Sequence, residues 1–438
     1  MTAAQRILRG HVLSFHGDPF AAPVEEVLTS IEDGAIAIEG GQIIAVGEAC
    51  DIIGQGAAAP SDDHRGKFLM PGFVDTHVHY PQVDIIGAVN TGLADWLERY
   101  TFPAEMAFSV EDHARSAARF MLDRLMAGGV TTAAVYSTVH ERAADIFFEE
   151  SAKDDLLMVC GKVCMDRNAP DALLDTPQHA YDASKALIER WHGSGRAHYA
   201  VTPRFAITST AEQLEAIGAL WAEYPDLVMQ THLSEQRAEI ETVLSLFPDA
   251  QDYLSVYERF GLVGPGAVFG HAIHLSQSER QRMQERGAAV AHCPTSNEFL
   301  SSGAFNLAAT RADAPDLSIG LASDVGGGTS LSMFETMRGA YRAALRNGTQ
   351  VTPLEMLYLA TAGGAKVLGL GKKIGQVAPH RDADIIVLDP KATPDLARLT
   401  GVAEALEGIL MALIMLGDDR AVSAVYVSGE RVRAEAVQ

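Results

Sequence analysis

The sequence predicts an α/β protein built on a (β/α)8 TIM-like barrel, with a small accessory sheet assembled from both termini. Three observations support this fold class. Short apolar runs alternate with helical patterns through the middle of the chain, both ends of the chain show β-strand patterns instead, and polar side chains follow the apolar runs where these end. With 438 residues, of which 47% are hydrophobic, the chain is long enough for one large barrel and a smaller accessory part.

The barrel strands are predicted from eight apolar runs. They lie at residues 73–79, 129–137, 156–164, 198–205, 226–233, 267–273, 288–294 and 317–324. Amphipathic helical patterns separate most of them, such as residues 211–225, where Thr210 stands at the expected N-cap. Near-continuous apolar strands between amphipathic helices are typical of a parallel sheet that is buried on both faces, and eight such units suggest a closed barrel.

The two ends of the chain predict the accessory part. Residues 34–48 read as two strands around a Gly-Gly turn, and residues 382–390 and 422–432 read as further strands, the last with a Ser-Gly turn. We therefore expect three regions. Residues 1–67 and 376–438 form the two parts of the accessory sheet, and residues 68–375 form the barrel.

The composition excludes several classes of function. The formal net charge of −23, from 34 basic and 57 acidic residues, argues against nucleic-acid binding, which needs a basic face. Residues 1–17 contain no signal peptide, and the apolar segment at 409–417 is far shorter than the ~20 residues of a membrane-spanning helix. Four cysteines make no disulfide framework, and Cys160 and Cys164 fit strand packing best. We expect a soluble, cytoplasmic protein with no membrane partner.

Polar residues gather where the predicted strands end. They are His77, His79, Arg204, His232, His271, His292 and Asp324. In a (β/α)8 barrel the carboxyl ends of the strands form the active site, whatever the chemistry. His77 and His79 are two residues apart on one strand, so both side chains can point into the mouth of the barrel. With a third histidine and a carboxylate they make a ligand set suited to zinc or iron, and such a metal lowers the pKa of a water towards about 7.

Each of these residues also has a plainer interpretation. A lone His-x-His pair is common, His232 could neighbour a helix cap, His271 could be a buried structural histidine, and Asp324 could belong to a turn. Their joint occurrence at four strand ends favours the metal site. His274 lies beyond its strand and receives no ligand role, while for His292 indirect support and direct contact both stay open.

Several motifs resemble one known family. "PGFVDTHVHYPQ", "THLSE", the strand-end His271 and "ASD" at Asp324 resemble the amidohydrolase superfamily. "LERYTFPAE", "TPRF", "HCPTSN" and "LSSGAFN" resemble, more narrowly, the guanine deaminases within it. The resemblance runs from about residue 68 to the end, while the first 65 residues match only loosely.

The resemblance implies a (β/α)8 barrel with an accessory β-sandwich formed from both termini, residues 1–67 and 376–438, around a catalytic barrel of residues 68–375. It also implies a homodimer with one zinc per subunit, with iron as the alternative metal, and hydrolytic deamination of guanine to xanthine and ammonia in purine catabolism. The metal ligands it implies are His77, His79, His232 and Asp324, with His271 contacting the metal-bound water rather than, or as well as, the metal. The catalytic residues it implies are Glu235, Asp324 and His271. The purine would be held by Gln82, Arg204 and Phe205, together with His232, Glu235 and Asp324.

The chemistry assigns a role to each of these groups. Water must add at C2 of guanine and ammonia must leave, so the site needs an activated water and a proton carrier. Glu235, three residues after His232, can protonate N3 and then the leaving amine. Asp324 takes a proton from the water and His271 orients it. Arg204 can donate to O6, and Gln82 can donate and accept at once.

Plainer interpretations stay open here too. Glu235 could simply favour the start of a helix, Arg204 could be an ion-pair residue, and Phe205 could stack on the purine or merely pack. Trp96 fits core or lid packing better than a platform for the base.

Three rival functions remain. A related ring deaminase or chlorohydrolase would act on cytosine, a triazine or an adenosine derivative. A binuclear dihydroorotase-type hydrolase would need a lysine on the fourth strand, whereas Lys162 lies on the third. A scaffold of the same fold would bind no metal. The identity of the metal, the substrate range and the dimer surface are not determined by the sequence.

Overall fold

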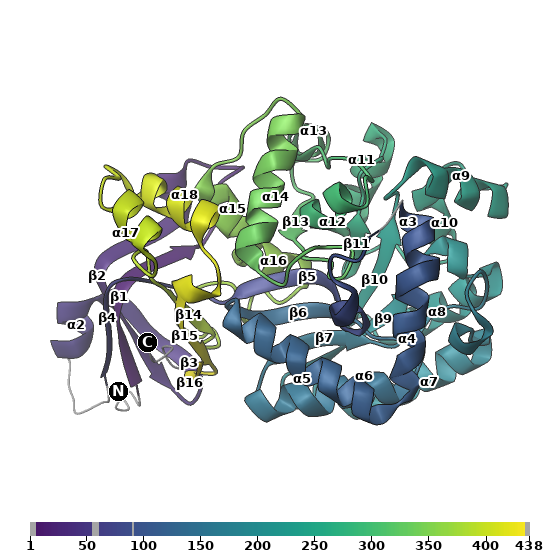
Figure 1. Cartoon of the computed structure of the whole chain (residues 1–438), viewed down its shortest axis with the longest axis horizontal. Helices are drawn as coiled ribbons and strands as arrows, with labels where there is room; N and C mark the ends of the chain where they lie inside the picture. The colour runs from purple at the N-terminus through teal and green to yellow at the C-terminus, as the bar shows by residue number, and fades with distance from the viewer. Residues whose placement is uncertain (1–5, 55–60, 90–91, 434–438) are drawn as a thin grey trace.

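A computed structural model of the chain describes residues 6–54, 61–89 and 92–433. Its centre is a nearly closed barrel of eight parallel strands (Figure 1), which confirms the predicted fold class. The strands are β5 (Phe73–His79), β6 (Val130–Tyr136), β7 (Leu157–Gly161), β9 (Ala197–Pro203), β10 (Val228–Leu233), β11 (Ala267–His271), β12 (Ala289–His292) and β13 (Ser318–Leu321). They follow one another in chain order, and the two-residue β8 (Val163–Cys164) pairs with β9.

The barrel strands form because their side chains are buried on both faces. All seven residues of β5 and all seven of β6 are buried, as the apolar runs predicted. The run predicted at 156–164 is divided at Lys162, whose buried ammonium bonds to Asp175. Cys160 and Cys164 are buried, free thiols in the same core, consistent with strand packing.

Helices cover the outside of the barrel. They are α5 (Glu111–Ala127), α6 (Glu141–Ser151), α7 (Pro177–Trp191), α8 (Ala211–Glu223), α9 (Arg237–Leu246), α10 (Tyr253–Arg259), α11 (Gln277–Arg286), α12 (Pro294–Phe299), α13 (Leu307–Asp313), α14 (Met333–Arg346), α15 (Pro353–Leu359) and α16 (Ala362–Val367). Local sequence sets where they begin. The Thr210 hydroxyl accepts a hydrogen bond from the backbone N–H of Gln213, so the predicted N-cap of α8 is confirmed.

A run of short helical turns follows β5. It comprises a 3₁₀ turn (Tyr80–Ile85), α3 (Leu93–Trp96), a π-helical turn (Leu97–Thr101) and α4 (Phe102–Met106). This run carries several of the residues that line the site described below.

The two termini build a second sheet beside the barrel, at the left of Figure 1. Its order is β16-β15-β14-β4-β1-β2-β3. The strands are β1 (Arg6–Phe15), β2 (Leu28–Glu39), β3 (Gln42–Glu48), β4 (Ser61–Pro71), β14 (Ile385–Leu388), β15 (Val422–Val427) and β16 (Glu430–Arg433). Gly40 and Gly41 turn the predicted β2–β3 hairpin with positive φ angles of 57° and 79°, which glycine adopts without strain.

The short helices α1 (Val24–Val27) and α2 (Ala49–Gly54) lie against the terminal sheet. The helices α17 (Pro394–Thr400) and α18 (Leu406–Leu416) pack against each other, and α18 also packs on α14 and α15. The domain boundaries at 67/68 and 375/376 stay a prediction, and β4 runs across the first of them. The outermost parts of the predicted terminal regions, residues 1–5 and 434–438, lie outside the described residues. Among the helices of the described ranges, none is long and apolar enough to cross a membrane.

Candidate active site

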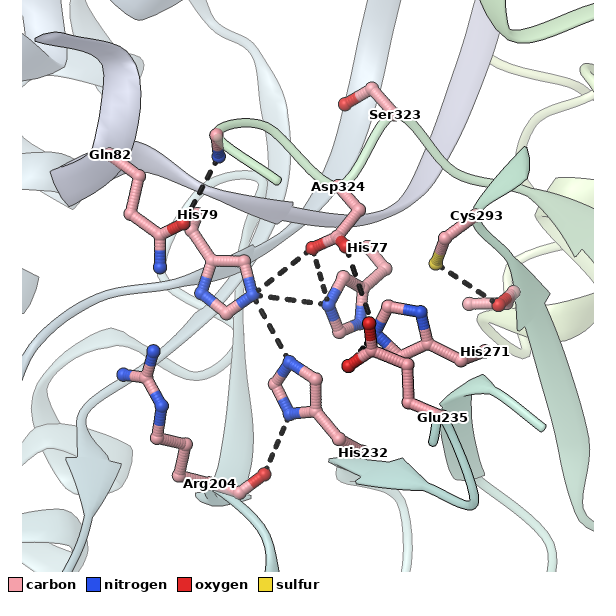
Figure 2. A network of polar contacts seen from close by, with 12 residues as sticks. His77, His79, Gln82, Arg204, His232, Glu235, His271, Cys293, Ser323 and Asp324 are labelled. Atoms are coloured by element: carbon pink, nitrogen blue, oxygen red, sulfur yellow. Dashed lines mark hydrogen bonds and ion pairs between the residues drawn. The ribbon is translucent and has the colours of Figure 1, made fainter. Parts of the chain in front are cut away.

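The ends of four barrel strands bring five titratable side chains together, as Figure 2 shows. His77 and His79 come from the end of β5, and His232 from the end of β10. His271 is the last residue of β11, and Asp324 lies three residues beyond the end of β13. Hydrogen bonds from the backbone N–H of Asp324 to the carbonyl of His77, at 2.9 Å, and from His79 to Val325 join the two edges of the barrel here.

Four of these side chains converge on one point. The Nε2 atom of His77 lies 3.1 Å from Nε2 of His79 and 3.1 Å from Oδ1 of Asp324. The Nε2 atom of His79 lies 3.3 Å from the same Asp324 oxygen and 3.3 Å from Nε2 of His232. The structure therefore places the four predicted metal ligands with their ligand atoms facing one another.

The backbone is held in unusual conformations to achieve this. His271, Ala272 and Asp324 have positive φ angles of 66°, 50° and 48°, in the left-handed region that residues with a side chain rarely adopt. Gly270 leaves room for the imidazole of His77, because a Cβ atom at residue 270 would stand 2.8 Å from Cε1 of His77. Such strain is typical of functional sites, where the surrounding structure fixes the geometry.

The electrostatics of the cluster suit a cation. Burial lowers the pKa of all three histidines, His77, His79 and His232. The pKa of His79 falls to about 3 and that of His232 lies well below its usual value, so the imidazoles are neutral. Burial alone would raise the pKa of Asp324, but His77 and the neighbouring histidines hold it well below its usual value. The cluster thus combines three neutral nitrogen donors with one anion.

The tautomer of His232 is fixed in the same sense. Its Nδ1–H donates to the backbone carbonyl of Arg204 at 2.7 Å, which leaves the lone pair of Nε2 directed at the cluster. A backbone partner of this kind is usual for histidines that bind metals.

The donor set fits a divalent metal such as zinc. One ligand atom from each of His77, His79, His232 and Asp324 lies within 4.8 Å of all the others. Three imidazoles and a carboxylate match the preferences of zinc and of iron. A second combination exchanges His79 and His232 for His271 and Cys293. Burial raises the pKa of the Cys293 thiol well above its usual value, so this residue is the poorer ligand, because metals bind the thiolate.

Glu235 lies beside the cluster and is fully enclosed. Its Oε2 atom lies 3.6 Å from Nε2 of His271, and its Oε1 atom accepts a hydrogen bond from the Ser302 hydroxyl at 2.7 Å. Burial raises the pKa of Glu235 above its usual value. The start of α9 is capped by Gln236 and Glu239 instead, so Glu235 does not serve as the first-turn acid of that helix.

His271 stands between two carboxylates. Its Nε2 atom lies 3.7 Å from Oδ2 of Asp324 as well as close to Glu235, and its Nδ1 atom is hydrogen-bonded to Oδ1 of Asn297 at 2.8 Å. Burial lowers its pKa, but the charges of Glu235 and Asp324 outweigh that effect and leave it raised. His271 therefore faces the same space as the acid and the metal ligands.

A pocket opens over the cluster. Of the polar side chains above, His79, His232, Glu235, His271 and Asp324 line it, and its apolar lining consists of Leu93, Trp96, Leu97, Phe205 and Leu300. Trp96 is 2% exposed, as the packing interpretation expected, and it also forms part of this wall. A few polar groups beside apolar side chains are typical of sites for small molecules.

Gln82 and Arg204 line one side of the pocket. Both atoms of the Glu105 carboxylate accept hydrogen bonds from Nη1 of Arg204, at 2.6 and 2.8 Å, so the ion-pair interpretation of Arg204 is correct and compatible with a place in the pocket. The Oε1 atom of Gln82 accepts from the backbone N–H of Gly326 at 3.1 Å, and its Nε2 donates to Glu105 at 3.3 Å. One Nε2–H of Gln82 therefore remains for a ligand, and its Oε1 keeps one lone pair beside the bond to Gly326.

Two further histidines lie outside this cluster. Nε2 of His274 is hydrogen-bonded to the carbonyl of Ser302 at 2.9 Å, consistent with the absence of a ligand role. His292 is buried against Phe305, and neither metal-ligand combination includes it within the described part of the chain.

The sequence analysis missed three residues that support the site. Glu105, Asn297 and Ser302 hold Arg204, His271 and Glu235 respectively. None follows a barrel strand directly, so a search of strand ends passes over them. All three nevertheless lie inside the motifs "LERYTFPAE", "HCPTSN" and "LSSGAFN".

Comparison with known proteins places the chain in a family. Residues 68–432 match the model of the amidohydrolase family. Guanine deaminase from Escherichia coli (strain K12) is 42% identical over 414 residues, which are 93% of each chain. The solved E. coli guanine deaminase superposes with a TM-score of 0.95, at 41% identity, and covers 98% of this chain and 99% of its own.

A guanine deaminase from C. acetobutylicum, solved with guanine bound in its active site, has a TM-score of 0.88 at 28% identity over 98% of this chain and all of its own (100%). Since both the sequence and the fold agree over nearly the whole length, the chain belongs to the amidohydrolase family and, within it, to the guanine deaminases.

Proposed function

We propose that this hydrolase converts guanine to xanthine and ammonia. The observation that carries the proposal is one pocket that unites a four-ligand metal cluster, an enclosed acid and a donor pair. The relatives named as guanine deaminases, and the relative solved with guanine in its active site, support the choice of substrate.

Zinc is the metal that we propose, with iron as the alternative. His77, His79, His232 and Asp324 would hold it, since their ligand atoms already face one another. When bound, such an ion lowers the pKa of a water towards about 7 and so supplies the nucleophile at neutral pH.

Asp324, His271 and Glu235 then manage the protons. Asp324 accepts a proton from the attacking water, and His271, 3.7 Å from Asp324, orients that water. Oxygen adds to C2 as Glu235 delivers a proton to N3. Glu235 then recovers a proton from the new C2 hydroxyl and passes it to the amine, so the C2–N bond breaks, ammonia leaves and C2 becomes a carbonyl. The proton that Asp324 took from the water returns to Glu235 and restores the acid for the next turnover. The raised pKa of Glu235, caused by burial, suits a group that must both hold and release a proton near neutral pH.

Gln82, Arg204 and Phe205 orient the purine. The guanidinium of Arg204 donates to the O6 carbonyl, and the Nε2–H of Gln82 donates to an acceptor on the ring edge. Phe205, 7% exposed in the apolar lining of the pocket, packs against the flat face of the base.

The proposal is tested with purified protein and a panel of bases. Guanine, adenine, cytosine and melamine are incubated separately, and ultraviolet absorbance and ammonia are followed together. We expect xanthine and ammonia in equal amounts from guanine alone. Turnover of another ring in place of guanine would be compatible with the proposed role of the metal but would contradict the roles of Gln82 and Arg204. We also propose a cytoplasmic homodimer in purine catabolism, which gel filtration and cell fractionation test.

A further inference from the structure

Glu105 is a buried carboxylate that the catalytic roles above leave without a task. Its side chain is 0% exposed, and it projects from α4, outside the ring of barrel strands. Both oxygens accept from Nη1 of Arg204, at 2.6 and 2.8 Å, and Oε1 also accepts from Nε2 of Gln82 at 3.3 Å. One acid therefore contacts both side chains that would read the edge of the base.

The first consequence concerns charge. Arg204 is 3% exposed, and a guanidinium buried without a counter-charge would attract an anionic ligand. Glu105 neutralises it locally. The pair then offers oriented N–H donors with little net charge, which suits a neutral carbonyl acceptor better than an anion.

The second consequence concerns direction. Glu105 occupies Nη1 of Arg204, which leaves the Nε and Nη2 groups of the fork for a ligand. It also takes one N–H of Gln82, whose carbonyl is already engaged by the N–H of Gly326, so one Nε2–H remains. Glu105 thus determines which N–H donors of Arg204 and Gln82 are left to face the base.

The third consequence concerns the pocket wall. Leu93, Trp96 and Leu97 line the pocket, and the chain continues from them through the π-helical turn directly into α4. The pair of Glu105 with Arg204 fastens this wall to the end of β9.

We propose that Glu105 is a positioning residue that makes the pocket select a neutral purine carbonyl over a purine anion. This inference rests on the proposed function, because it presumes that a purine occupies the pocket. It assigns to Glu105 a part in specificity that differs from proton transfer.

The test compares two ligands that differ in charge. Hypoxanthine is a neutral purine with the O6 carbonyl and no C2 amine, and urate is a purine anion at neutral pH. Their dissociation constants are measured by calorimetry with the zinc-loaded protein, and guanine turnover is measured on the same preparations. The variants are E105Q, E105D and the control E150Q. Glu150 is also buried, 1% exposed, and pairs with Arg115 at 2.6 Å, but it does not line the pocket.

In E105Q we expect the ratio of the urate to the hypoxanthine dissociation constant to fall about tenfold, because the unpaired Arg204 now favours the anion. The KM for guanine rises about tenfold and kcat changes by less than about threefold, since the metal and Glu235 are untouched. E105D retains the charge, so it keeps the wild-type ratio while the KM for guanine rises. E150Q keeps the ratio and the KM, whatever it does to thermal stability.

A ratio of urate to hypoxanthine dissociation constants equal to that of the wild type in a folded E105Q would overturn the inference. An altered ratio in E105D would also overturn it, and E105D provides the test if E105Q does not fold. The binding ratio needs no turnover. Wild-type protein that binds hypoxanthine but leaves guanine intact would therefore refute the proposed function and still allow the role of Glu105 to be decided.

Discussion

Replacing Gly270 with alanine tests whether the packing behind His77 positions a metal ligand. A Cβ atom at residue 270 would stand 2.8 Å from Cε1 and 2.9 Å from Nδ1 of His77, whereas ordinary contacts begin at 3.4 Å. The imidazole must therefore retreat by about 0.6 Å, close to the ~0.5 Å within which a site must be held to function. His77 faces both His79 and Asp324 at 3.1 Å, so the displacement disturbs the whole ligand set.

We expect G270A to lose about 10- to 100-fold in zinc affinity, the range found when residues that support metal ligands are changed. Protein freed of metal by dialysis against a chelator is titrated with zinc in the presence of a coloured competitor. The control is G264A, where the added Cβ would meet Trp221 at an ordinary 3.6 Å. Zinc affinity in G270A equal to that of the wild type would refute the packing argument.

Three other predictions follow from single residues. E235Q should retain zinc and bind hypoxanthine normally but lose about 10³-fold in kcat, and near-normal turnover would contradict its role in proton transfer. Burial lowers the pKa of His292 to about 3, so below about pH 6.5 the unfolded chain binds a proton that the folded chain refuses. Lowering the pH from about 8 to about 5 should therefore destabilise the wild type by about 2 kcal/mol more than H292N in urea unfolding, and equal losses would count against the argument. T210A should lower the free energy of unfolding by about 1 kcal/mol, because it removes the hydroxyl that accepts a hydrogen bond from the backbone N–H of Gln213 in α8. An unchanged urea midpoint would disprove this contribution.

The barrel was predictable because strands that are buried on both faces appear in the sequence as near-continuous apolar runs. Every predicted barrel strand has an observed counterpart, and the limits of β5 agree at both ends. The exception is instructive. Lys162 divides the third run, and its buried ammonium is paired with Asp175 in the segment that follows. A single pair of this kind leaves no periodic pattern in the sequence.

The candidate site was predictable only in part. Histidines at strand ends could be recognised as site residues, because a barrel brings the carboxyl ends of its strands together whatever the conformation of the loops. Glu105 arrives from a helix after a long connection, and Asn297 and Ser302 come from the segment beyond β12. The direction of the Gln82 amide depends on the backbone N–H of Gly326, which sequence alone does not place. Such partners depend on loop geometry.

The most direct measurement of the central claim is ammonia release from guanine as metal-free protein is titrated with zinc. Activity should be absent at the start, rise in proportion to added zinc, and level off at one equivalent per chain, when the site of His77, His79, His232 and Asp324 is full. Full activity before zinc is added, or none at a bound equivalent, would contradict the account.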